Sequence, residues 1–448
     1  RHDVHVERRK DDAVSGPGDA MQSDLLNSFD RFGEAFQQDP FPFYDAMRAA
    51  SPAWFHAPSN MYFITSYEHV NAVVKNPTVF SSEYGVSANE PPQPHIAEQI
   101  AEIKKKGWVR PATLMTVDPP NHTRYRATVA KAFNARVIAA LRPALEVIVE
   151  EALDALDYSQ PVDVKHLFSE PVPVKVIIKA LNMPVEDAAN VKRWSDDTTA
   201  GIGSRLSDER AIEAAHGVVE LQQFMHDEIQ KRIANPTDDV ISMLVKADLP
   251  LPEPDAEGNT TRKLTLEEAM GILQALVGAG NETTTKSFSA MLVDLATHPA
   301  EWEALKADPD RAALVVEESL RLSTPSQGLF RVAKVDAEVG GVPIPAGSKI
   351  FLAYTAANRD PAKFPEPNAF IPDRENVRDH MAFGGGVHFC IGAPLSRLES
   401  VIALEKIAQR WNTMEVTNAK GHPEEWPLRY EPSFVLRGLT SLHLRITC

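Results

Sequence analysis

The feature that most constrains this fold is a continuous helical pattern between residues 265 and 298. Thr265 and Glu268 form the T-x-x-E pattern of a capping box at its start, and Pro299 follows its end. About 32 residues at about 1.5 Å per residue give a helix on the order of 48 Å long. A helix of this length must cross the whole molecule, so the other elements are expected to pack around it.

The interior of this helix contains Gly271, Gly278 and Gly280. Each glycine costs about 1 kcal/mol relative to alanine inside a helix. Their presence predicts that something flat or bulky lies against the helix, or that the helix opens locally.

The rest of the chain has mostly helical periodicity with a few short strands. The clearest further helical patterns cover residues 136–156 and 212–233. Strand character occurs in residues 53–65, 341–357 and 439–446. No internal repeat or low-complexity linker divides the sequence, so we expect a mainly α fold with small β-sheets.

The chain of 448 residues is expected to form one domain over residues 35–448, after a mobile polar leader over residues 1–34. It has no apolar run of the roughly 18 to 20 residues that cross a bilayer. Its net charge of −16 argues against nucleic acid and anionic membranes as main partners. We expect a cytoplasmic protein without a membrane anchor or a nucleic-acid partner, and a monomer.

A second helical pattern begins near Pro309 and ends before Pro325. Glu318 and Arg321 are three residues apart in it and share one face of the helix. Taken by themselves, they are most simply a surface ion pair.

Cys390 lies in the stretch FGGGVHFCIG (residues 383–392), ahead of an apolar helical pattern. The other cysteine, Cys448, is the last residue, so neither a disulfide framework nor a cysteine-rich zinc site is expected. A nucleophilic thiol would need a base and an orienting group, and His388 could in principle serve as the base. A buried core cysteine would not need three preceding glycines.

A thiolate that binds a metal or a haem fits this stretch better. The glycines let the backbone turn tightly and approach a flat cofactor. The helix that begins after Gly392 directs backbone N–H groups and its positive dipole end toward the sulfur, which should hold Cys390 as a thiolate.

FGGGVHFCIG resembles the haem-binding loop of the cytochrome P-450 family, Phe-x-x-Gly-x-(Arg/His)-x-Cys-x-Gly. Three further matches occur in the order of that family, and the resemblance covers roughly residues 35–446. They are AGNETT (279–284), similar to the oxygen-activating segment of its central helix; ESLR (318–321), similar to its Glu-x-x-Arg motif; and F-x-x-P-x-x-F-x-x-x-R (364–374), similar to its segment before the cysteine loop. The last resemblance implies that Arg374 joins Glu318 and Arg321 in a buried network.

The resemblance implies the triangular cytochrome P-450 fold for residues 35–448, with haem b between the long central helix and the helix after the cysteine loop. Cys390 would bind the iron. Of the residues implied to contact the haem, four would bind its propionates, and two of these are four apart on one helical face. The propionate residues are His122, Arg126, Arg331 and His388, and the others are Ala279, Gly280, Phe383, Gly386, Cys390 and Gly392.

Glu282 and Thr283 match the acid–alcohol pair of the family. The resemblance implies that the Thr283 hydroxyl hydrogen-bonds the oxygen bound at the haem and that Glu282 relays protons from solvent. The plainer alternative is that Thr283 bonds back to its own helix. Because both residues are present, the resemblance favours monooxygenation, in which one atom of dioxygen enters a C–H or C=C bond of a hydrophobic small molecule.

The electrons for this reaction must come from elsewhere, because no phosphate-binding G-x-G-x-x-G after a strand is evident. The resemblance to soluble bacterial members implies a separate ferredoxin and a ferredoxin reductase. The ferredoxin would dock on the cysteine side, where Arg142, Arg397 or nearby lysines could form a positive patch.

Position within the family implies a mostly apolar substrate pocket. Its candidate residues are Trp108, Leu114, Met115, Leu276, Val277, Leu329, Phe330, Phe434 and Val435. The segment over residues 81–111 also carries three consecutive lysines (104–106) and Arg110. These cations are either plain surface charge or a site for a substrate carboxylate or a carrier protein.

Two other functions remain open. One is a haem-thiolate isomerase, dehydratase or peroxygenase, which needs no redox partner. The other is a non-catalytic haem protein for sensing or ligand storage, which has no use for Glu282 and Thr283.

Overall fold

The computed structural model describes residues 17–83, 93–131, 133–419 and 428–448. The expected leader falls partly outside the described residues, which begin at residue 17. Its remainder contains the helix Pro17–Asn27 and the buried Phe29, whose ring packs edge-on against Phe36 at 5.0 Å. The packed core therefore starts before residue 35, where the sequence analysis placed the domain boundary.

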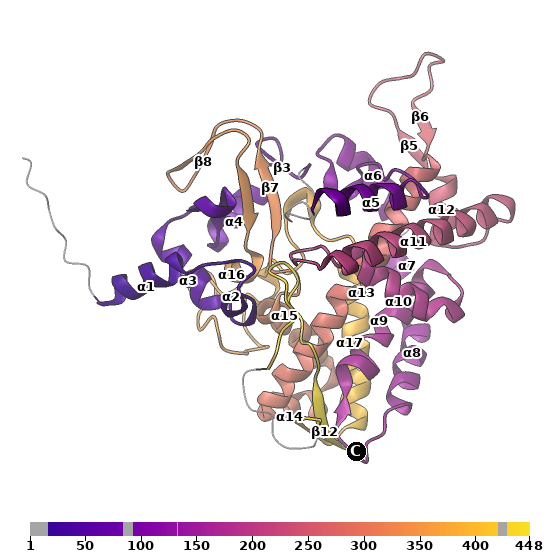
Figure 1. The fold of residues 1–448 in the computed structure, drawn as a ribbon. Coiled ribbons are helices and arrows are strands. Elements are labelled where there is room, and N and C mark those ends of the chain that lie inside the picture. Colours follow the sequence, from indigo (N-terminus) through magenta and orange to yellow (C-terminus); the bar gives the residue numbers. More distant parts are fainter. Residues whose placement is uncertain (1–16, 84–92, 132, 420–427) are drawn as a thin grey trace, which may run out of the picture.

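Helices dominate the described chain (Figure 1). None of the described helices combines the length and the apolar character that a bilayer crossing requires. The α-helices are α1 (Pro17–Asn27), α2 (Glu34–Gln38), α3 (Phe41–Ala50), α4 (Tyr67–Val74), α5 (Pro94–Lys104), α6 (Asn121–Ala130), α7 (Ala135–Ala139), α8 (Arg142–Asp154), α9 (Pro171–Leu181), α10 (Ala188–Thr199), α11 (Asp208–Ala234), α12 (Val240–Lys246), α13 (Leu266–Thr297), α14 (Pro299–Ala307), α15 (Ala312–Ser323), α16 (Tyr354–Ala357) and α17 (Ala393–Arg410).

The strands are short and form small sheets. They are β1 (Trp54–His56), β2 (Met61–Ile64), β3 (Phe80–Ser81), β4 (Val162–Asp163), β5 (Asp248–Pro250), β6 (Thr261–Lys263), β7 (Leu329–Ala333), β8 (Ala337–Val339), β9 (Val342–Ile344), β10 (Lys349–Leu352), β11 (Thr413–Thr417) and β12 (His443–Thr447).

The largest sheet has the strand order β1-β2-β10-β7-β3, in which β10 is parallel to β2 and the other pairs are antiparallel. It lies with α3, α4 and α16 on one side of the molecule, away from α8 to α11 (Figure 1). Residues 53–65 form two strands, as predicted. The stretch 341–357 forms β9 and β10 but ends in α16, and the predicted tail strand is β12.

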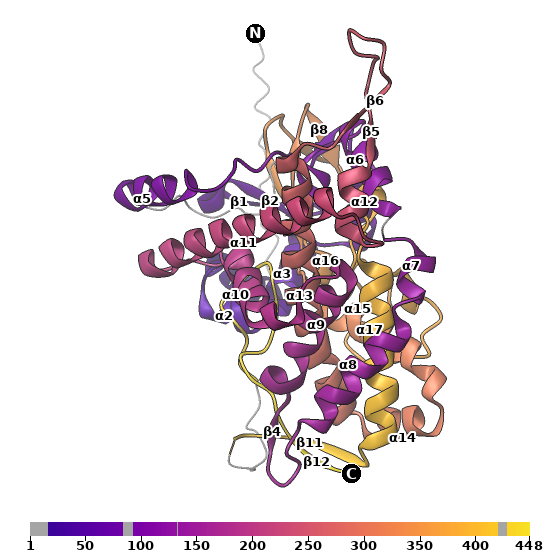
Figure 2. The same cartoon turned by 90° about the vertical axis from the view of Figure 1, so that its right-hand side faces the viewer.

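The predicted long helix is α13, which has 32 residues and runs through the helical part of the molecule (Figure 2). Both bonds of its capping box are present: Glu268 N donates to Thr265 Oγ1 at 3.2 Å, and Thr265 N donates to Glu268 Oε2 at 2.8 Å. The helix is continuous, so it does not open locally. A Cβ at Gly278 would lie 3.0 Å from Thr198 of α10, so this glycine admits a neighbouring helix.

The pair on α15 is buried and not a surface ion pair. Arg321 donates from Nε and Nη2 to the two oxygens of Glu318, both at 2.8 Å, and further to the carbonyls of Pro367 and Ala369. Arg374 lies 3.4 Å from the same carboxylate. This network fixes the segment before the cysteine loop to α15, and so holds that loop at a defined distance from the core.

Candidate active site

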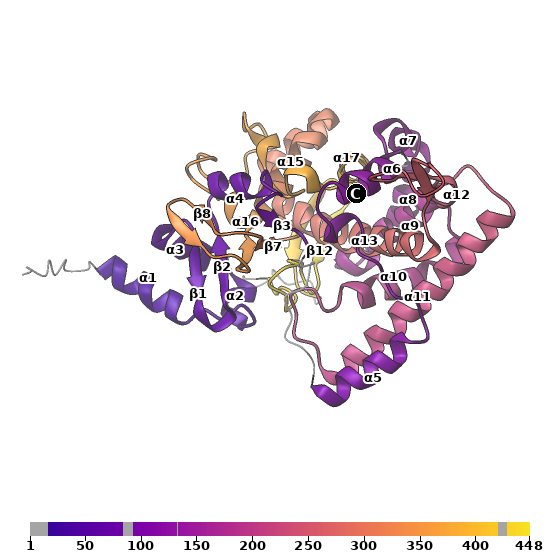
Figure 3. The same ribbon diagram turned by 90° about the horizontal axis from the view of Figure 1, so that it is seen from above.

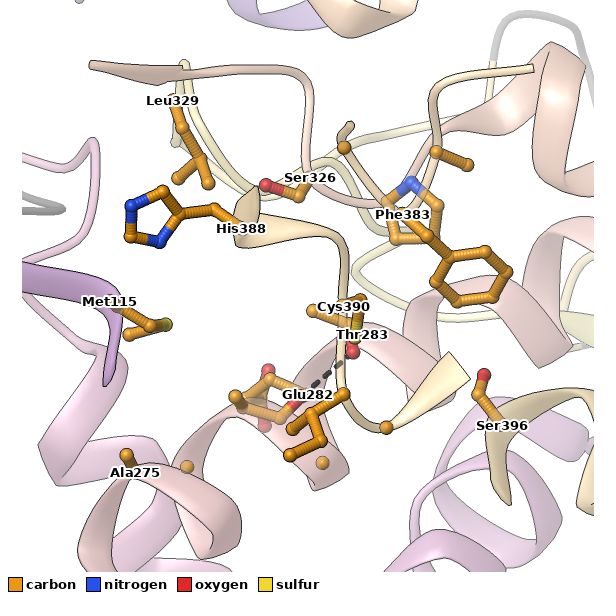
Figure 4. Close-up of a pocket in the computed structure, with 18 of the residues that line it drawn as sticks. Met115, Ala275, Glu282, Thr283, Ser326, Leu329, Phe383, His388, Cys390 and Ser396 are labelled. Atoms are coloured by element: carbon orange, nitrogen blue, oxygen red, sulfur yellow. Dashed lines mark hydrogen bonds between the residues drawn. The ribbon is translucent and has the colours of Figure 1, made fainter. Parts of the chain in front are cut away.

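A cavity lies between α13 and the cysteine loop with α17 (Figure 4). Its wall is built from segments that are far apart in the sequence. Figure 4 labels Met115 from the loop before α6, Ala275, Glu282 and Thr283 from α13, Ser326 and Leu329 from the chain after α15, Phe383, His388 and Cys390 from the cysteine loop, and Ser396 from α17.

Most of the residues predicted from the sequence line this one cavity. Glu282 and Thr283 are among them. The predicted haem contacts that line it are His122, Arg126, Ala279, Gly280, Arg331, Phe383, His388, Cys390 and Gly392, and the predicted pocket residues are Leu114, Met115, Leu276, Leu329, Phe330 and Val435.

Three predicted pocket residues lie outside this lining because other contacts hold them. The Trp108 ring stacks on His226 of α11, with ring centroids 5.0 Å apart. Val277 is fully buried in the core on another face of α13. Phe434 is also fully buried and packs against Phe330 at 6.1 Å. The structure therefore does not place these three side chains in the pocket.

Gly386 also lies outside the lining and shapes the cysteine loop from behind. Its φ is +62°, and a Cβ there would clash with the Val74 carbonyl oxygen. Gly384 has a φ of +69°. Because both residues occupy the left-handed region, the loop can return so that Cys390 N donates to Phe383 O at 2.9 Å.

The Cys390 sulfur faces the cavity and accepts hydrogen bonds from the backbone N–H groups of Gly392 and Ala393. This is the predicted arrangement at the start of α17. Burial nevertheless raises the pKa of the Cys390 thiol, and the two N–H groups with Arg126 offset this only in part. The helix terminus therefore favours the thiolate less than the sequence alone suggests, and a bound metal ion would displace the thiol proton.

One edge of the cavity gathers cations and imidazoles. The rings of His122 and His388 lie 4.1 Å apart, and the buried His122 Nδ1 and His388 Nε2 have no hydrogen-bond partner. Burial and the charge of Arg126 lower the pKa of His122 to about 4. Burial, His122 and Arg331 lower the pKa of His388 to about 3. Among the described residues no carboxylate pairs with Arg126 or Arg331, so this edge is built for an anionic ligand.

The residues of the cavity fit haem b. Two guanidinium groups and two unpartnered imidazole nitrogens at one edge are donors for the two propionates, and Cys390 is placed to bind the iron.

The sequence analysis missed two polar groups at this edge. Tyr354 hydrogen-bonds Arg331, and the buried Ser82 hydroxyl has no partner. A tyrosine inside the apolar run IFLAYTAA was the available signal for the first.

Glu399 on α17 is a third residue that the sequence analysis missed. It lines the cavity, is 2% exposed, and its Oε2 has no hydrogen-bond partner. Burial raises the pKa of Glu399 well above its ordinary value, and a hydrogen bond with Thr284 of α13 offsets little of this. A carboxyl group four residues after the cavity-lining Leu395, and so on the same helical face, was the signal that could have found it.

Glu282 lies in a network of charges. Lys286 Nζ is 2.8 Å and Lys192 Nζ is 3.4 Å from its carboxylate, and Lys286 also pairs with Glu431 at 2.7 Å. Burial opposes ionisation of Glu282, but Lys286, Asp196 and Lys192 together lower its pKa. Burial and Glu282 raise the pKa of Asp196 to about 7. The two carboxyl groups therefore share one proton near neutral pH, and Asp196, whose side chain is 39% exposed, carries it.

The Thr283 hydroxyl donates to the carbonyl of Ala279 at 2.8 Å, as the plainer alternative predicted (Figure 4). The residue still lines the cavity. Because a hydroxyl oxygen can accept while it donates, Thr283 can take a hydrogen bond from a neighbour in this conformation.

The expected positive patch on the cysteine side is neutralised by acids. Arg397 donates to the buried Glu317 at 3.0 Å and lies over the Phe383 ring at 4.5 Å. Arg142 pairs with Glu405 of α17 at 3.1 Å. Both arginines therefore serve the packing of α17 and leave little unpaired charge for a partner.

The fold and this cavity define a haem-thiolate protein, and comparisons with known proteins agree. The family model described as Cytochrome P450 matches residues 312–428. Cytochrome P450 109 of Bacillus spizizenii is 32% identical over 412 residues, which are 91% of this chain and 92% of that relative. The 6-deoxyerythronolide B hydroxylase of Saccharopolyspora erythraea is 33% identical over 331 residues, 74% and 77% of the two chains.

A solved structure of CYP109E1 from Bacillus megaterium in complex with testosterone matches with a TM-score of 0.76 and 29% identity. The match covers 93% of this chain and 100% of that one. This chain belongs to the cytochrome P450 family. It is a monooxygenase whose cofactor is haem b, and the resemblance found in the sequence is confirmed.

Proposed function

We propose that this cytochrome P450 inserts one oxygen atom from dioxygen into a C–H or C=C bond of a hydrophobic small molecule. The observation that carries this proposal is the uncharged wall of the cavity opposite the cysteine, formed by Leu114, Met115, Ile202, Ala275, Leu276, Leu329 and Val435. The names of the relatives, a 6-deoxyerythronolide B hydroxylase and a testosterone complex, support the same substrate class.

Haem b with a thiolate ligand supplies dioxygen activation and O–O cleavage when bound. The chain supports this chemistry in three ways. Cys390 would bind its iron, the cationic edge would bind its carboxylates, and α13 would close the opposite side of the cavity. The apolar wall excludes water from the reacting atoms, which protects the oxidant for the substrate.

Protons reach the cavity through side chains. Asp196 takes up a proton from solvent, since its side chain is partly exposed and its pKa is about 7. Glu282 shares that proton and lies next to Thr283 on α13. The Thr283 hydroxyl lines the cavity and donates its own proton to the Ala279 carbonyl, so it accepts a hydrogen bond from the protonated reacting oxygen and holds that oxygen in place.

The electrons come from a separate ferredoxin and ferredoxin reductase in the cytoplasm, with the enzyme acting as a monomer. Phe389, next to the cysteine, is 39% exposed and offers an apolar contact. Lys131 and Arg136 at α6 and α7 are exposed, and among the described residues neither forms an ion pair. They replace Arg142 and Arg397 as the expected positive contacts, because α7 packs against α17.

The Asp196–Glu282–Thr283 path separates this function from its rivals. An isomerase, a dehydratase or a non-catalytic haem protein needs no proton delivery to oxygen. A peroxygenase receives its oxygen already reduced and needs no redox partner. The path therefore favours oxygenation from dioxygen.

Isotope labelling tests the proposal. A substrate is first chosen from steroids, terpenes, fatty acids and aromatic compounds by its ability to shift the haem spin state. With ferredoxin, reductase, NADPH and ¹⁸O₂, we expect one ¹⁸O atom in each product and one NADPH consumed per product. Product that forms at the same rate from hydrogen peroxide without the redox proteins, or without any oxidant, would assign one of the rival functions.

A further inference from the structure

The loop between α5 and Leu114 carries an unpaired guanidinium group. Arg110 forms no hydrogen bond or ion pair with any described residue. Solvent reaches its side chain, yet the protein around it lowers the pKa of Arg110 by desolvation. Arg110 is therefore a cation partly surrounded by protein atoms and not a freely hydrated surface charge.

Contacts with α11 fix this loop in place (Figure 3). Trp108 N donates to Gln222 Oε1, and Gln222 Nε2 donates back to Trp108 O, both at 3.0 Å. The Trp108 ring stacks on His226 with an interplanar angle of 15°. These contacts are two residues before Arg110, so the position of the guanidinium is set by the fold.

Gly271 brings Arg110 against the central helix. A Cβ at Gly271 would lie 3.4 Å from Arg110 Cγ and 3.9 Å from its Nε. Ala275, one turn further along α13, lines the cavity, and so does Leu114, four residues later in the loop. Arg110 therefore lies at the rim of the cavity, about one helical turn outside its lining.

The cavity itself offers no cation to a substrate. Its positively charged or imidazole side chains, His122, Arg126, Arg331 and His388, form the edge that fits the propionates. Its other ionisable side chains near α13 are the acids Glu282 and Glu399. Along the described wall, the pocket therefore offers a negatively charged substrate group no cation apart from those that fit the propionates. Arg110 lies at its rim and is not among them.

We propose that Arg110 binds the oxyanion head of an amphipathic substrate, a carboxylate or a phosphate monoester, whose alkyl chain enters the apolar cavity. This inference rests on the proposed monooxygenase function for the direction of the chain. From Gly271 to Ala279, α13 rises about 12 Å, which an extended chain of about ten carbons spans. Oxidation then falls about ten carbons from the head.

Binding to the haem-loaded protein tests this inference. We expect dodecanoate to bind at least about tenfold more tightly than dodecan-1-ol, because a charge-assisted hydrogen bond to the guanidinium is available only to the acid. Binding is followed by the haem spin state and, independently, by the shift in thermal unfolding. Arg110→Gln should remove this preference without weakening the binding of dodecan-1-ol. Lys106→Gln, which removes a neighbouring loop cation, should keep it.

Dodecyl phosphate separates the two possible heads. If it also binds more tightly than the alcohol, and loses this advantage in Arg110→Gln, the site accepts oxyanions in general; if only dodecanoate does so, the site is fitted to a carboxylate. Equal affinities of the unaltered protein for acid and alcohol, or an unchanged preference in Arg110→Gln, would overturn the inference. Failure of the proposed function is distinct, since it would appear as missing ¹⁸O incorporation whatever residue occupies position 110.

Discussion

At the residue scale, neighbours decide what Glu282 and Thr283 can do. Two lysines keep Glu282 ionised, and Asp196, whose pKa is about 7, holds the proton that the pair shares. The Thr283 hydroxyl stays bonded to its own helix while it lines the cavity. In the proposed mechanism, the Asp196–Glu282 pair supplies the proton, and the Thr283 hydroxyl positions the oxygen that receives it.

Removal of either group should separate electron use from product formation. In Thr283→Ala we expect NADPH consumption to continue while hydrogen peroxide replaces most of the product, because the proton no longer reaches the right oxygen atom. Glu282→Gln should slow product formation about 10²-fold or more, the usual contribution of a positioned proton donor. Thr283→Ser retains the hydroxyl and is the matched control. Product yield per NADPH that is unchanged in Thr283→Ala would contradict this role.

Glu399 predicts a pH dependence of stability. The pKa of Glu399 in the folded protein is raised well above its ordinary value of 4.5, so the folded protein favours the protonated carboxyl group. The contribution of Glu399 to stability is therefore fully present below pH 4.5 and is lost as the pH rises toward the raised pKa. The stability advantage of Glu399→Gln over the unaltered protein should therefore grow above pH 4.5, by at most about 1.4 kcal/mol per pH unit.

Urea unfolding of the haem-loaded proteins at pH 5 and pH 8 measures this difference. Glu405→Gln, on the same helix but paired at the surface with Arg142, controls for the loss of a carboxylate. A difference between Glu399→Gln and the unaltered protein that is equal at both pH values would show that Glu399 does not titrate as its burial requires.

At the element scale, α15 and the segment before the cysteine loop act as one unit. Arg321 donates to Glu318 and to the carbonyls of Pro367 and Ala369, and the side chains of Arg321 and Glu318 are both fully buried. A lysine has three donors on one atom and cannot satisfy this planar arrangement.

Arg321→Lys keeps the charge but leaves buried acceptors without their hydrogen bonds, so it should destabilise the protein by about 1 to 3 kcal/mol for each such acceptor. The variant should also bind haem poorly, because the cysteine loop is no longer held. Haem content and urea unfolding measure both effects. Arg429→Lys, at an exposed pair with Glu34, should be neutral. A fully haem-loaded Arg321→Lys of ordinary stability would contradict the role of the network.

The sequence predicted elements better than it predicted faces. Thr265 with Glu268 and the following proline located α13 because caps and proline act through local backbone chemistry. Leu276 and Val277 are neighbours in that helix, yet only Leu276 lines the cavity, since successive residues point about 100° apart. The motif residues could be assigned to one site from the sequence because the motifs occur in the order of one known fold. Tyr354 belongs to no such motif, and only the tertiary packing shows that it lies beside Arg331.

At the scale of the whole molecule, an acidic chain must still meet an electron donor. The net charge is −16, and many arginines near the cysteine side are paired with acids. Among the described residues, Lys131 and Arg136 form no ion pair, so each should contribute strongly to the docking of the electron donor. Complementary charges raise the rate at which two proteins associate.

The double substitution Lys131→Glu with Arg136→Glu should raise the KM for ferredoxin about tenfold at low salt. At high salt, the KM values of the doubly substituted and the unaltered protein should differ less. Reduction by dithionite should be unaffected, since it needs no docking. Lys263→Glu, on the projecting β5–β6 hairpin, is the control (Figure 1). A KM unchanged by the double substitution would place the docking surface elsewhere.

The central claim is that the sulfur of Cys390 binds the haem iron as a thiolate. The absorption spectrum of the purified, reduced protein under carbon monoxide tests it most directly. We predict the strongly red-shifted Soret band of a thiolate-ligated haem for the unaltered protein, and its loss in Cys390→Ser. A Soret band typical of histidine ligation in the unaltered protein, or an unaltered red-shifted band in Cys390→Ser, would contradict the claim.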